Sequence, residues 1–235
     1  MPRKHGPLEV LPVPVARALG RDPFWFVIGG HAVRCFCPYR PSDDVDFGVG
    51  SAKDLRALLE ALEARGRVVV LERSADTVHL QFAGIDVSVF VLPGIRKHTE
   101  EHTLTAEAVL ATKLHAILDR GTRRDFFDLY VMMEQERFGL VDCFRAIRAV
   151  YETEVNEGLL LRAVTYFDDA EAEARLPGEG PRDWDRVRGF FVTAAGALIT
   201  PPAAPLEIQR RVVGVHGPGT RSAKSTPSRP RSRRR

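Results

Sequence analysis

The sequence contains no long apolar run. No segment of the 235 residues approaches the roughly 20 consecutive apolar residues that span a bilayer. The N-terminal stretch MPRKHGPLEVLPVPV carries basic residues but no uninterrupted apolar core, so a secretory signal is not expected. A hydrophobic content of 44% and a charged content of 28% are typical of soluble globular proteins. We therefore expect a cytoplasmic protein without a membrane partner.

Cysteine is also scarce. The chain has 3 cysteines, and Cys35 and Cys37 are too close in sequence for the usual spacing of a zinc-binding pair. Cys143 lies far from both. We expect reduced thiols, which fit a cytoplasmic location.

The positive charge is concentrated at one end of the chain. Of the 34 Lys and Arg residues, 7 lie in residues 216–235, which contain no Asp or Glu; the rest of the chain carries 27 basic and 31 acidic residues. This tail is rich in Ser, Pro and Arg, so it is predicted to be disordered. Two interpretations stay open. The tail is an arm that binds RNA or another polyanion, or it is a solubilising segment or an accident of where the reading frame ends.

The first hundred residues have the pattern of an α/β unit. Apolar and β-branched runs predict strands, leucines at helical spacing predict a helix, and two alternating runs around a short turn predict a hairpin. The predicted elements are a strand at Pro23–Gly30, a helix at His31–Phe36, a strand at Asp44–Val49, a helix at Ala52–Arg65, a strand at Arg67–Glu72 and a hairpin of Val78–Phe82 and Asp86–Leu92.

The pattern becomes helical after Pro93. The predicted helices are Thr105–Arg120, which ends at Gly121, then Thr122–Glu136, Val141–Glu152, Gly158–Phe167 and Trp184–Leu198. The second of these is apolar nearly all round, so it should be buried. We therefore predict an α+β protein. A small mixed β-sheet core with flanking helices fills residues 1–100, a helical region follows in residues 101–200, and the disordered basic tail occupies residues 216–235.

Acidic residues lie on two of the predicted strands. Asp44 and Asp46 are one residue apart, so their side chains leave the same face, with Cα atoms about 6.5 Å apart. Asp86 lies in another, otherwise apolar strand, and a neighbouring strand would be only about 4.8 Å away. Such carboxylates repel one another without a cation, and they are ligands that one or two Mg²⁺ ions prefer. For Asp44 alone, a solvated residue after the Pro41-Ser42 turn is the competing interpretation.

A glycine pair, Gly29-Gly30, stands between a predicted strand and a predicted helix. Backbone N–H groups at such a turn can approach a phosphate, and the helix dipole favours its negative charge. Any tight turn would also use two glycines. Their place 14 residues before Asp44, within the length of one β-α-β unit, favours the phosphate-binding interpretation.

These motifs resemble a known family. GGHAV, YRPSDDVDF and the strand of Asp86 are similar to the nucleotidyltransferase core of the DNA polymerase β superfamily, with its glycine pair, D-x-D and later third acid. Residues 111–133, ATKLHAILDRGTRRDFFDLYVMM, resemble the K-L-x-A-L-x-x-R…R-D-x-x-D-L block of the AbiEii/AbiGii toxins, which include the MenT toxins. The resemblance covers residues 24–133, and two linked blocks in the same order make it specific.

The resemblance implies a metal-dependent nucleotidyltransferase that moves an NMP from an NTP to an acceptor hydroxyl. In this family the acids matching Asp44 and Asp46 bind metal and triphosphate, and the residues matching Lys113 and Asp125 are implicated in activity. Asp86 would bind a second Mg²⁺ ion and position or deprotonate the acceptor hydroxyl. The acceptor would be RNA, at the 3′ end of a tRNA, and the protein would be the toxin of an abortive-infection or other toxin–antitoxin pair, with an antitoxin protein as partner.

Three further residues are candidates for contacts with the nucleotide. His31 stands where the family usually has Ser or Thr, so a hydroxyl contact with phosphate is lost. Arg40 could touch the triphosphate, or it is an exposed arginine of a turn. Lys113 lies on the apolar stripe of its helix, where it would contact the β- and γ-phosphates or extend its amine into solvent.

The acids that follow Lys113 also have structural interpretations. Thr122 and Asp125 have the spacing of a capping box, which is compatible with a functional role for Asp125. Asp128 is predicted to be structural and to pair with Arg124 or Arg120.

Two alternatives to an RNA-modifying enzyme stay open. The same chemistry could act on a small molecule such as an antibiotic, or on a protein hydroxyl. An inactive homologue could instead bind nucleotide or RNA, which His31 and the basic tail motivate.

Overall fold

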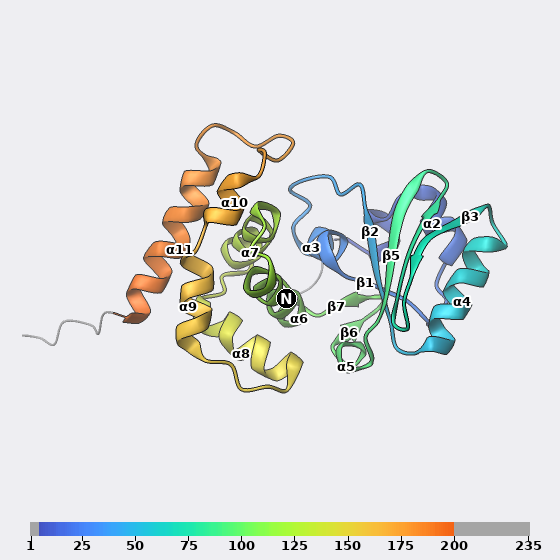
Figure 1. The fold of residues 1–235 in the computed structure, drawn as a ribbon, viewed down its shortest axis with the longest axis horizontal. Coiled ribbons are helices and arrows are strands. Elements are labelled where there is room, and N and C mark those ends of the chain that lie inside the picture. The colour runs from blue at the N-terminus through green and yellow to red at the C-terminus, as the bar shows by residue number, and fades with distance from the viewer. Residues whose placement is uncertain (1–4, 200–235) are drawn as a thin grey trace, which may run out of the picture. The chain divides into compact units, whose positions relative to one another are not determined.

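The computed structural model describes residues 5–199, in which a seven-stranded mixed sheet forms the centre of the first half. The strands are β1 (Phe26–Val27), β2 (Val45–Val49), β3 (Val68–Arg73), β4 (Thr77–Phe82), β5 (Ile85–Val91), β6 (Thr99–Glu100) and β7 (Thr103–Leu104). Their order is β3-β4-β5-β2-β1-β7-β6 (Figure 1). β2 is parallel to β5 and β1 is parallel to β7, while the other neighbours are antiparallel. The predicted α+β class with a mixed sheet is confirmed.

Helices flank the sheet and form the second half of the described chain. They are α1 (Pro7–Val10), α2 (Val13–Leu19), α3 (Gly29–Phe36), α4 (Ala52–Glu63), α5 (Pro93–Arg96), α6 (Ala106–Asp119), α7 (Arg123–Glu136), α8 (Leu140–Tyr151), α9 (Glu157–Thr165), α10 (Asp168–Ala172) and α11 (Asp183–Ile199). Across residues 5–199, no helix combines the length and the apolar character that crossing a bilayer requires.

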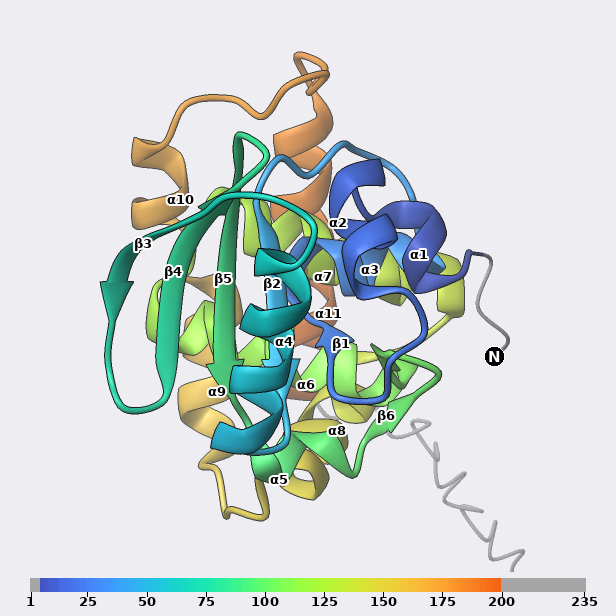
Figure 2. The same ribbon diagram turned by 90° about the vertical axis from the view of Figure 1, so that its right-hand side faces the viewer.

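The two faces of the sheet differ in polarity. Alternate residues such as Val45, Phe47 and Val87 are buried, and α4 packs on their side with its own buried leucines (Figure 2). The residues between them, such as Asp46 and Ser88, leave the opposite face because side chains alternate along a strand. The helices α6 to α11 gather on that second side of the sheet (Figure 1).

The hairpin of β4 and β5 turns at two residues with positive φ. Ala83 has φ of 53° and Gly84 has φ of 77°. Two such residues match the right-handed twist of the flanking strands. The predicted hairpin is therefore confirmed, and it fixes the register in which Gln81 lies opposite Asp86.

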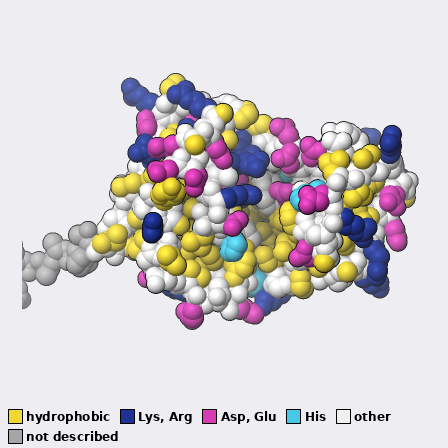
Figure 3. All heavy atoms as spheres, viewed as in Figure 1, with side chains coloured by type: hydrophobic (Ala, Val, Ile, Leu, Met, Phe, Trp, Pro, Cys, Tyr) yellow, Lys and Arg dark blue, Asp and Glu magenta, His cyan; other side chains and the backbone are white. Residues whose placement is uncertain are grey.

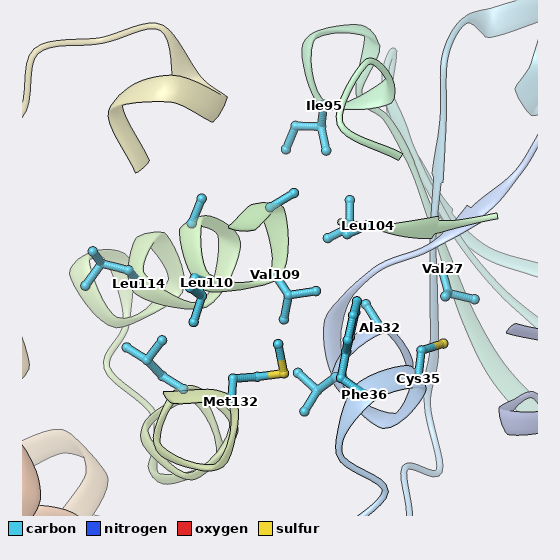
Figure 4. Close-up of a cluster of buried hydrophobic side chains, with 14 of the residues drawn as sticks. Val27, Ala32, Cys35, Phe36, Ile95, Leu104, Val109, Leu110, Leu114 and Met132 are labelled. Atoms are coloured by element: carbon cyan, nitrogen blue, oxygen red, sulfur yellow. The ribbon is translucent and has the colours of Figure 1, made fainter. Parts of the chain in front are cut away.

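A continuous apolar core joins the sheet to the helices. Val109 and Leu110 of α6 and Met132 of α7 lie beside Phe36 of α3 and Leu104 of β7 (Figure 4). The predicted burial of α7 on nearly all sides is confirmed. As predicted, α6 ends just before Gly121, whose φ of 54° favours glycine.

Some predicted boundaries are wrong. The strand predicted at Pro23–Gly30 is only Phe26–Val27, because Gly29 and Gly30 open helix α3 instead of ending the strand. The short elements α1, α2, α5, α10, β6 and β7 were not predicted, since runs of two to seven residues carry little periodicity. The three cysteines are buried thiols. The predicted disordered tail, residues 216–235, lies outside the described residues.

Candidate active site

Asp46 lies at the centre of the candidate site, on the polar face of β2. Asp44 precedes the strand by one residue, and its side chain is 56% exposed. Burial raises the pKa of Asp46, and the nearby Asp44 carboxylate adds to this, while Lys113 and Arg124 act in the opposite direction. The two carboxylates therefore lie near each other, in surroundings that carry both signs of charge, although Asp44 stands just outside the strand on which it was predicted.

The glycine pair is required by close packing against this carboxylate. Gly29 has φ of 60°, and a Cβ at this position would collide with Oδ2 of Asp46. A Cβ on Gly30 would lie 2.7 Å from the hydroxyl of Ser42 and 3.3 Å from the guanidinium of Arg40. The N-terminus of α3 thus lies against Asp46 and the loop before β2, and no side chain of the described chain caps it.

Asp86 lies on the same face as Asp46 but does not converge with it. Asp46 pairs with Ser88 of the parallel strand β5, which places Asp86 one pleat away, beside the start of β2. The exposed Asp86 carboxylate accepts a hydrogen bond of 2.9 Å from Nε2 of Gln81. Within residues 5–199, no three His, Cys, Asp or Glu side chains are close enough to hold a metal ion.

Helix α7 forms the opposite wall of the site. Nη1 of Arg124 lies 3.7 Å from Oδ2 of Asp44, and both side chains are about half exposed. A cavity of about 130 Å³ lies here, and it is lined by Arg40, Pro41, Ser42, Asp43, Asp44, Arg124, Leu176 and Pro177. In Figure 3, a hollow separates the two halves, with Lys and Arg side chains along its helical side and Asp and Glu side chains on the sheet side.

Lys113 belongs to a buried network of ion pairs. Its Nζ lies 2.7 Å from Oδ2 of Asp128 and 3.2 Å from Oδ1 of Asp125. Arg120 contacts Asp125 at 2.9 Å, and Arg40 holds both carboxylate oxygens of Asp128 at 2.9 and 3.0 Å. Three cations against two carboxylates leave one positive charge, which the nearby Asp46 carboxylate balances. A cation bound at Asp44 and Asp46 would leave this charge free to attract a negatively charged ligand in the hollow.

Thr122 caps the start of α7. Its hydroxyl accepts from the Asp125 N–H at 3.3 Å, as the predicted cap requires, and donates to Oδ2 of Asp125 at 2.6 Å, so the carboxylate binds the hydroxyl and not the backbone N–H of Thr122. Burial alone would raise the pKa of Asp125. The charge of Lys113 and hydrogen bonds from Arg120 and Thr122 outweigh that effect and lower the pKa to about 2. Asp125 is therefore ionised and held in place at neutral pH.

The predicted partners of Asp128 are wrong. Its carboxylate binds Arg40 and Lys113 and accepts a hydrogen bond of 2.5 Å from the Tyr39 hydroxyl, whereas Arg124 reaches Asp44 across the hollow. Asp128 is buried, so tertiary partners from α6 and from the loop before β2 replace the neighbours on its own helix. The interpretation of Arg40 as an exposed turn residue is also wrong, because its side chain is only 10% exposed.

His31 lies fully buried in the first turn of α3. Neither ring nitrogen has a hydrogen-bond partner of normal geometry in the described chain. Burial, with the charges of Arg34 and Arg40, lowers the pKa of His31 to about 4, although the backbone of Asp44 slightly favours the protonated ring. The imidazole is therefore neutral at physiological pH.

Three residues of the site were missed in the sequence. Tyr39 and Arg124 are adjacent to predicted site residues, but their contacts join the two halves. Arg120 follows helix α6 and contacts Asp125 at the start of α7. Arg120 and Arg124 fall inside the block that resembles the toxins, which was the available signal.

The loop that covers one side of the cavity is also fixed by an arginine. Arg123 pairs with Glu179 through two nitrogens, and its guanidinium stacks on Trp184 with 4.4 Å to the ring centroid. Glu179 in turn accepts from the N–H of Leu176, which lines the cavity. Arg123 therefore positions the wall formed by Leu176 and Pro177.

A known family and a known protein are similar to parts of the chain. Residues 93–203 match the family described as "Nucleotidyl transferase AbiEii toxin, Type IV TA system". A protein of Aquifex aeolicus (strain VF5), "Uncharacterized protein aq_aa25", is 26% identical over 176 residues, which cover 71% of this chain and 84% of that protein.

Solved structures provide a second comparison. "Crystal structure of putative nucleotidyltransferase from H. pylori" is similar in fold, with a TM-score of 0.52 and 17% identity, over 80% of this chain and 92% of that one. A solution structure of the antibiotic-resistance factor ANT(2'')-Ia has a TM-score of 0.44 and 12% identity, over 60% of this chain and 89% of that one. Residues 93–203 thus match the AbiEii family of nucleotidyltransferase toxins, and the fold of the chain is similar to that of the "putative nucleotidyltransferase" of H. pylori.

Proposed function

We propose that this protein uses a divalent cation, Mg²⁺, to move an NMP from an NTP to the 3′ hydroxyl of an RNA, and that it acts as the toxin of a toxin–antitoxin pair. The observation that carries the proposal is the Asp44–Asp46 pair, packed against the N-terminus of α3 and facing the positive charge of the Lys113 network. Carboxylates for a cation and positive groups for a triphosphate thus meet in one hollow.

The residues present fit a divalent cation. The buried Asp46 carboxylate has a raised pKa and lies near a second carboxylate, so a hard cation would relieve both the desolvation and the repulsion. Asp44 and Asp46 would hold it, and Asp86, on the same face, would contribute to a second ion. When bound, such cations neutralise charge on the reacting phosphates.

The chain's own residues would bind and orient the triphosphate. The backbone at Gly29 and Gly30 opens α3 and offers the positive end of its dipole to phosphate oxygens. The Arg124 side chain is about half exposed in the hollow, so it is the cation best placed to bind a phosphate there. Lys113 would act from its fixed place between Asp125 and Asp128 as a point charge for the leaving pyrophosphate.

Asp86 would serve as the base. It would accept the proton of the acceptor hydroxyl as that oxygen bonds to the α-phosphorus, while the bond from this phosphorus to the pyrophosphate oxygen breaks. Its exposure and its single hydrogen bond to Gln81 leave the carboxylate accessible to an incoming hydroxyl.

The acceptor is tested by label transfer. The protein is incubated with α-³²P-labelled NTPs and Mg²⁺, in turn with total RNA, with a protein lysate and with aminoglycosides. The proposal predicts label on RNA, and digestion from the 3′ end should release it. Label on protein or on the small molecules alone would contradict the RNA acceptor, while leaving the chemistry intact.

The toxin role is tested in cells. Induced expression of the chain should arrest growth, and coexpression of the neighbouring gene, if it encodes an antitoxin, should restore it. The Asp46→Asn variant should not arrest growth at an equal protein level. Growth arrest by this variant would contradict a toxicity that depends on nucleotidyl transfer.

A further inference from the structure

A second cavity, of about 520 Å³, lies at the same end of the sheet as Asp44, beside α2, the start of β3 and the turn between β4 and β5. It is lined by Pro14, Arg17, Ala18, Arg65, Gly66, Arg67, Val69, Gln81, Phe82, Ala83 and Gly84. Three arginines and no acid are among these residues. All three arginines are exposed, and within residues 5–199 none has an acidic partner within 4.0 Å.

The arginines come from different parts of the fold. Arg17 lies on α2, and Arg65 and Arg67 lie in the connection from α4 to β3. An arginine after a helix end interacts favourably with the negative end of the helix dipole, which offers a structural reason for Arg65. The same reason applies to Arg17, in the last turn of α2. It gives none for Arg67 or for three unpaired arginines that line one cavity. Like charges gathered without a counterion favour an anionic ligand.

The register of the sheet relates this cavity to the active site. Val45 pairs with Val87, Ile85 pairs with Phe82, and Phe82 pairs with Val68, so the starts of β2, β5 and β3 and the end of β4 share one sheet end. Three strand spacings of about 4.8 Å separate β2 from β3, which places Arg67 roughly 14 Å across the sheet from Asp44. Asp86 lies between the two sites.

We infer that Arg17, Arg65 and Arg67 form a phosphate-binding subsite for the backbone of the acceptor nucleic acid, several nucleotides from the reacting hydroxyl. The inference rests on the proposed RNA acceptor. A stacked strand advances about 3.4 Å per phosphate, so roughly four nucleotides span the distance. An acceptor whose terminal hydroxyl lies beside Asp86 would place its preceding phosphates on the three arginines. The planar guanidinium groups bind phosphate oxygens through paired hydrogen bonds.

The test measures binding separately from turnover. Affinity for a fluorescein-labelled 12-nucleotide oligouridylate is measured by anisotropy, for the full chain and for Arg17→Gln/Arg65→Gln/Arg67→Gln. We expect affinity to fall about tenfold, and the slope of log K against log salt to flatten by about 2, since each lost contact with a single strand removes about 0.7. Arg73→Gln is the matched control, an exposed arginine at the far end of β3, and it should bind as the parent chain does. Equal affinity and slope for the triple variant would overturn the inference.

Three further binding measurements identify the ligand. A uridine dinucleotide is too short to reach the arginines, so the triple variant should bind it unchanged. Mg²⁺–NTP affinity, measured by calorimetry, should also be unchanged, and a loss there would assign the arginines to the nucleotide and overturn the inference. Polyglutamate that competes as well as RNA would overturn a phosphate subsite. If RNA labelling fails but the triple variant still loses affinity for the oligouridylate, the proposed transfer reaction is wrong and the subsite stands.

Discussion

At the residue scale, the site depends on a glycine that no other residue can replace. Gly29 combines a φ of 60° with direct packing on the Asp46 carboxylate. The sequence predicted that the glycine pair approaches a phosphate. It could not show that the first contact is with Asp46, because that contact depends on how the chain returns through Tyr39–Asp44 to β2.

Gly29→Ala should abolish most of the activity. The new Cβ forces Asp46 or α3 to move, and a non-glycine residue at this φ costs about 1 kcal/mol in addition. We expect pyrophosphate release to fall at least about tenfold. Gly20→Ala separates the two effects, because Gly20 also has a positive φ, of 55°, but a Cβ there meets nothing within 4 Å. This variant should lose only the stability that the backbone conformation costs and should keep full activity. Equal activity of both variants would contradict the packing argument.

His31 should make the protein sensitive to acid. The unfolded chain protonates this residue below a pKa of about 6.5 and the folded chain only below about 4, so the unfolded state binds more protons between these values. Its contribution to stability is present above pH 6.5 and is lost as the pH falls toward 4.

The variant His31→Gln removes this titration. The free energy of unfolding is measured with urea at pH 7 and pH 4.5. Between these pH values it should fall by about 2–3 kcal/mol more in the parent protein than in the variant. His5→Gln is the control, since the His5 side chain is 42% exposed, and it should follow the parent protein. If the free energy of unfolding falls equally in the parent protein and in His31→Gln, the histidine is not buried in its neutral form.

At the element scale, α7 is the link between the two halves of the site. Its first turns carry Arg124, which faces Asp44, and Asp125 and Asp128, which fix Lys113 of α6 and Arg40 of the loop before β2. The sequence predicted this helix, its cap and its burial, because capping and periodicity are local. The partners of Asp128 could not be predicted, since they come from residues 15 and 88 positions earlier in the chain.

Asp128→Asn should therefore destabilise the fold. Removing this charge leaves the buried Arg40 and Lys113 with one fewer carboxylate, which typically costs about 3 kcal/mol. Urea unfolding measures the loss, and Asp119→Asn, an exposed acid at the end of α6, should change stability by less than about 0.5 kcal/mol. A double-mutant cycle with Arg40→Met should give a coupling energy of about 1–3 kcal/mol between Asp128 and Arg40. Additive losses would contradict the ion pair.

At the scale of the whole described chain, function depends on two halves that the sequence separates. The sheet supplies carboxylates and the helices supply cations, and a shared apolar core of α3, α6, α7 and β7 holds them together (Figure 4). Fold class, hairpin and the shared face of Asp46 and Asp86 followed from strand and helix periodicity. The position of Asp86 apart from the pair, and the distribution of arginines, depend on register and packing, which no local pattern contains.

The central claim is that Asp46 and its cation carry nucleotidyl transfer. The most direct test measures pyrophosphate released from NTP in the presence of acceptor RNA and Mg²⁺, for the parent chain, for Asp46→Asn and for the control Asp22→Asn, an exposed acid outside the site. Circular dichroism should show that all three chains are folded. We expect release to fall at least about a hundredfold in Asp46→Asn, to stay unchanged in Asp22→Asn and to stop when EDTA removes the cation. Unchanged release by a folded Asp46→Asn variant, or release that persists in EDTA, would contradict the account.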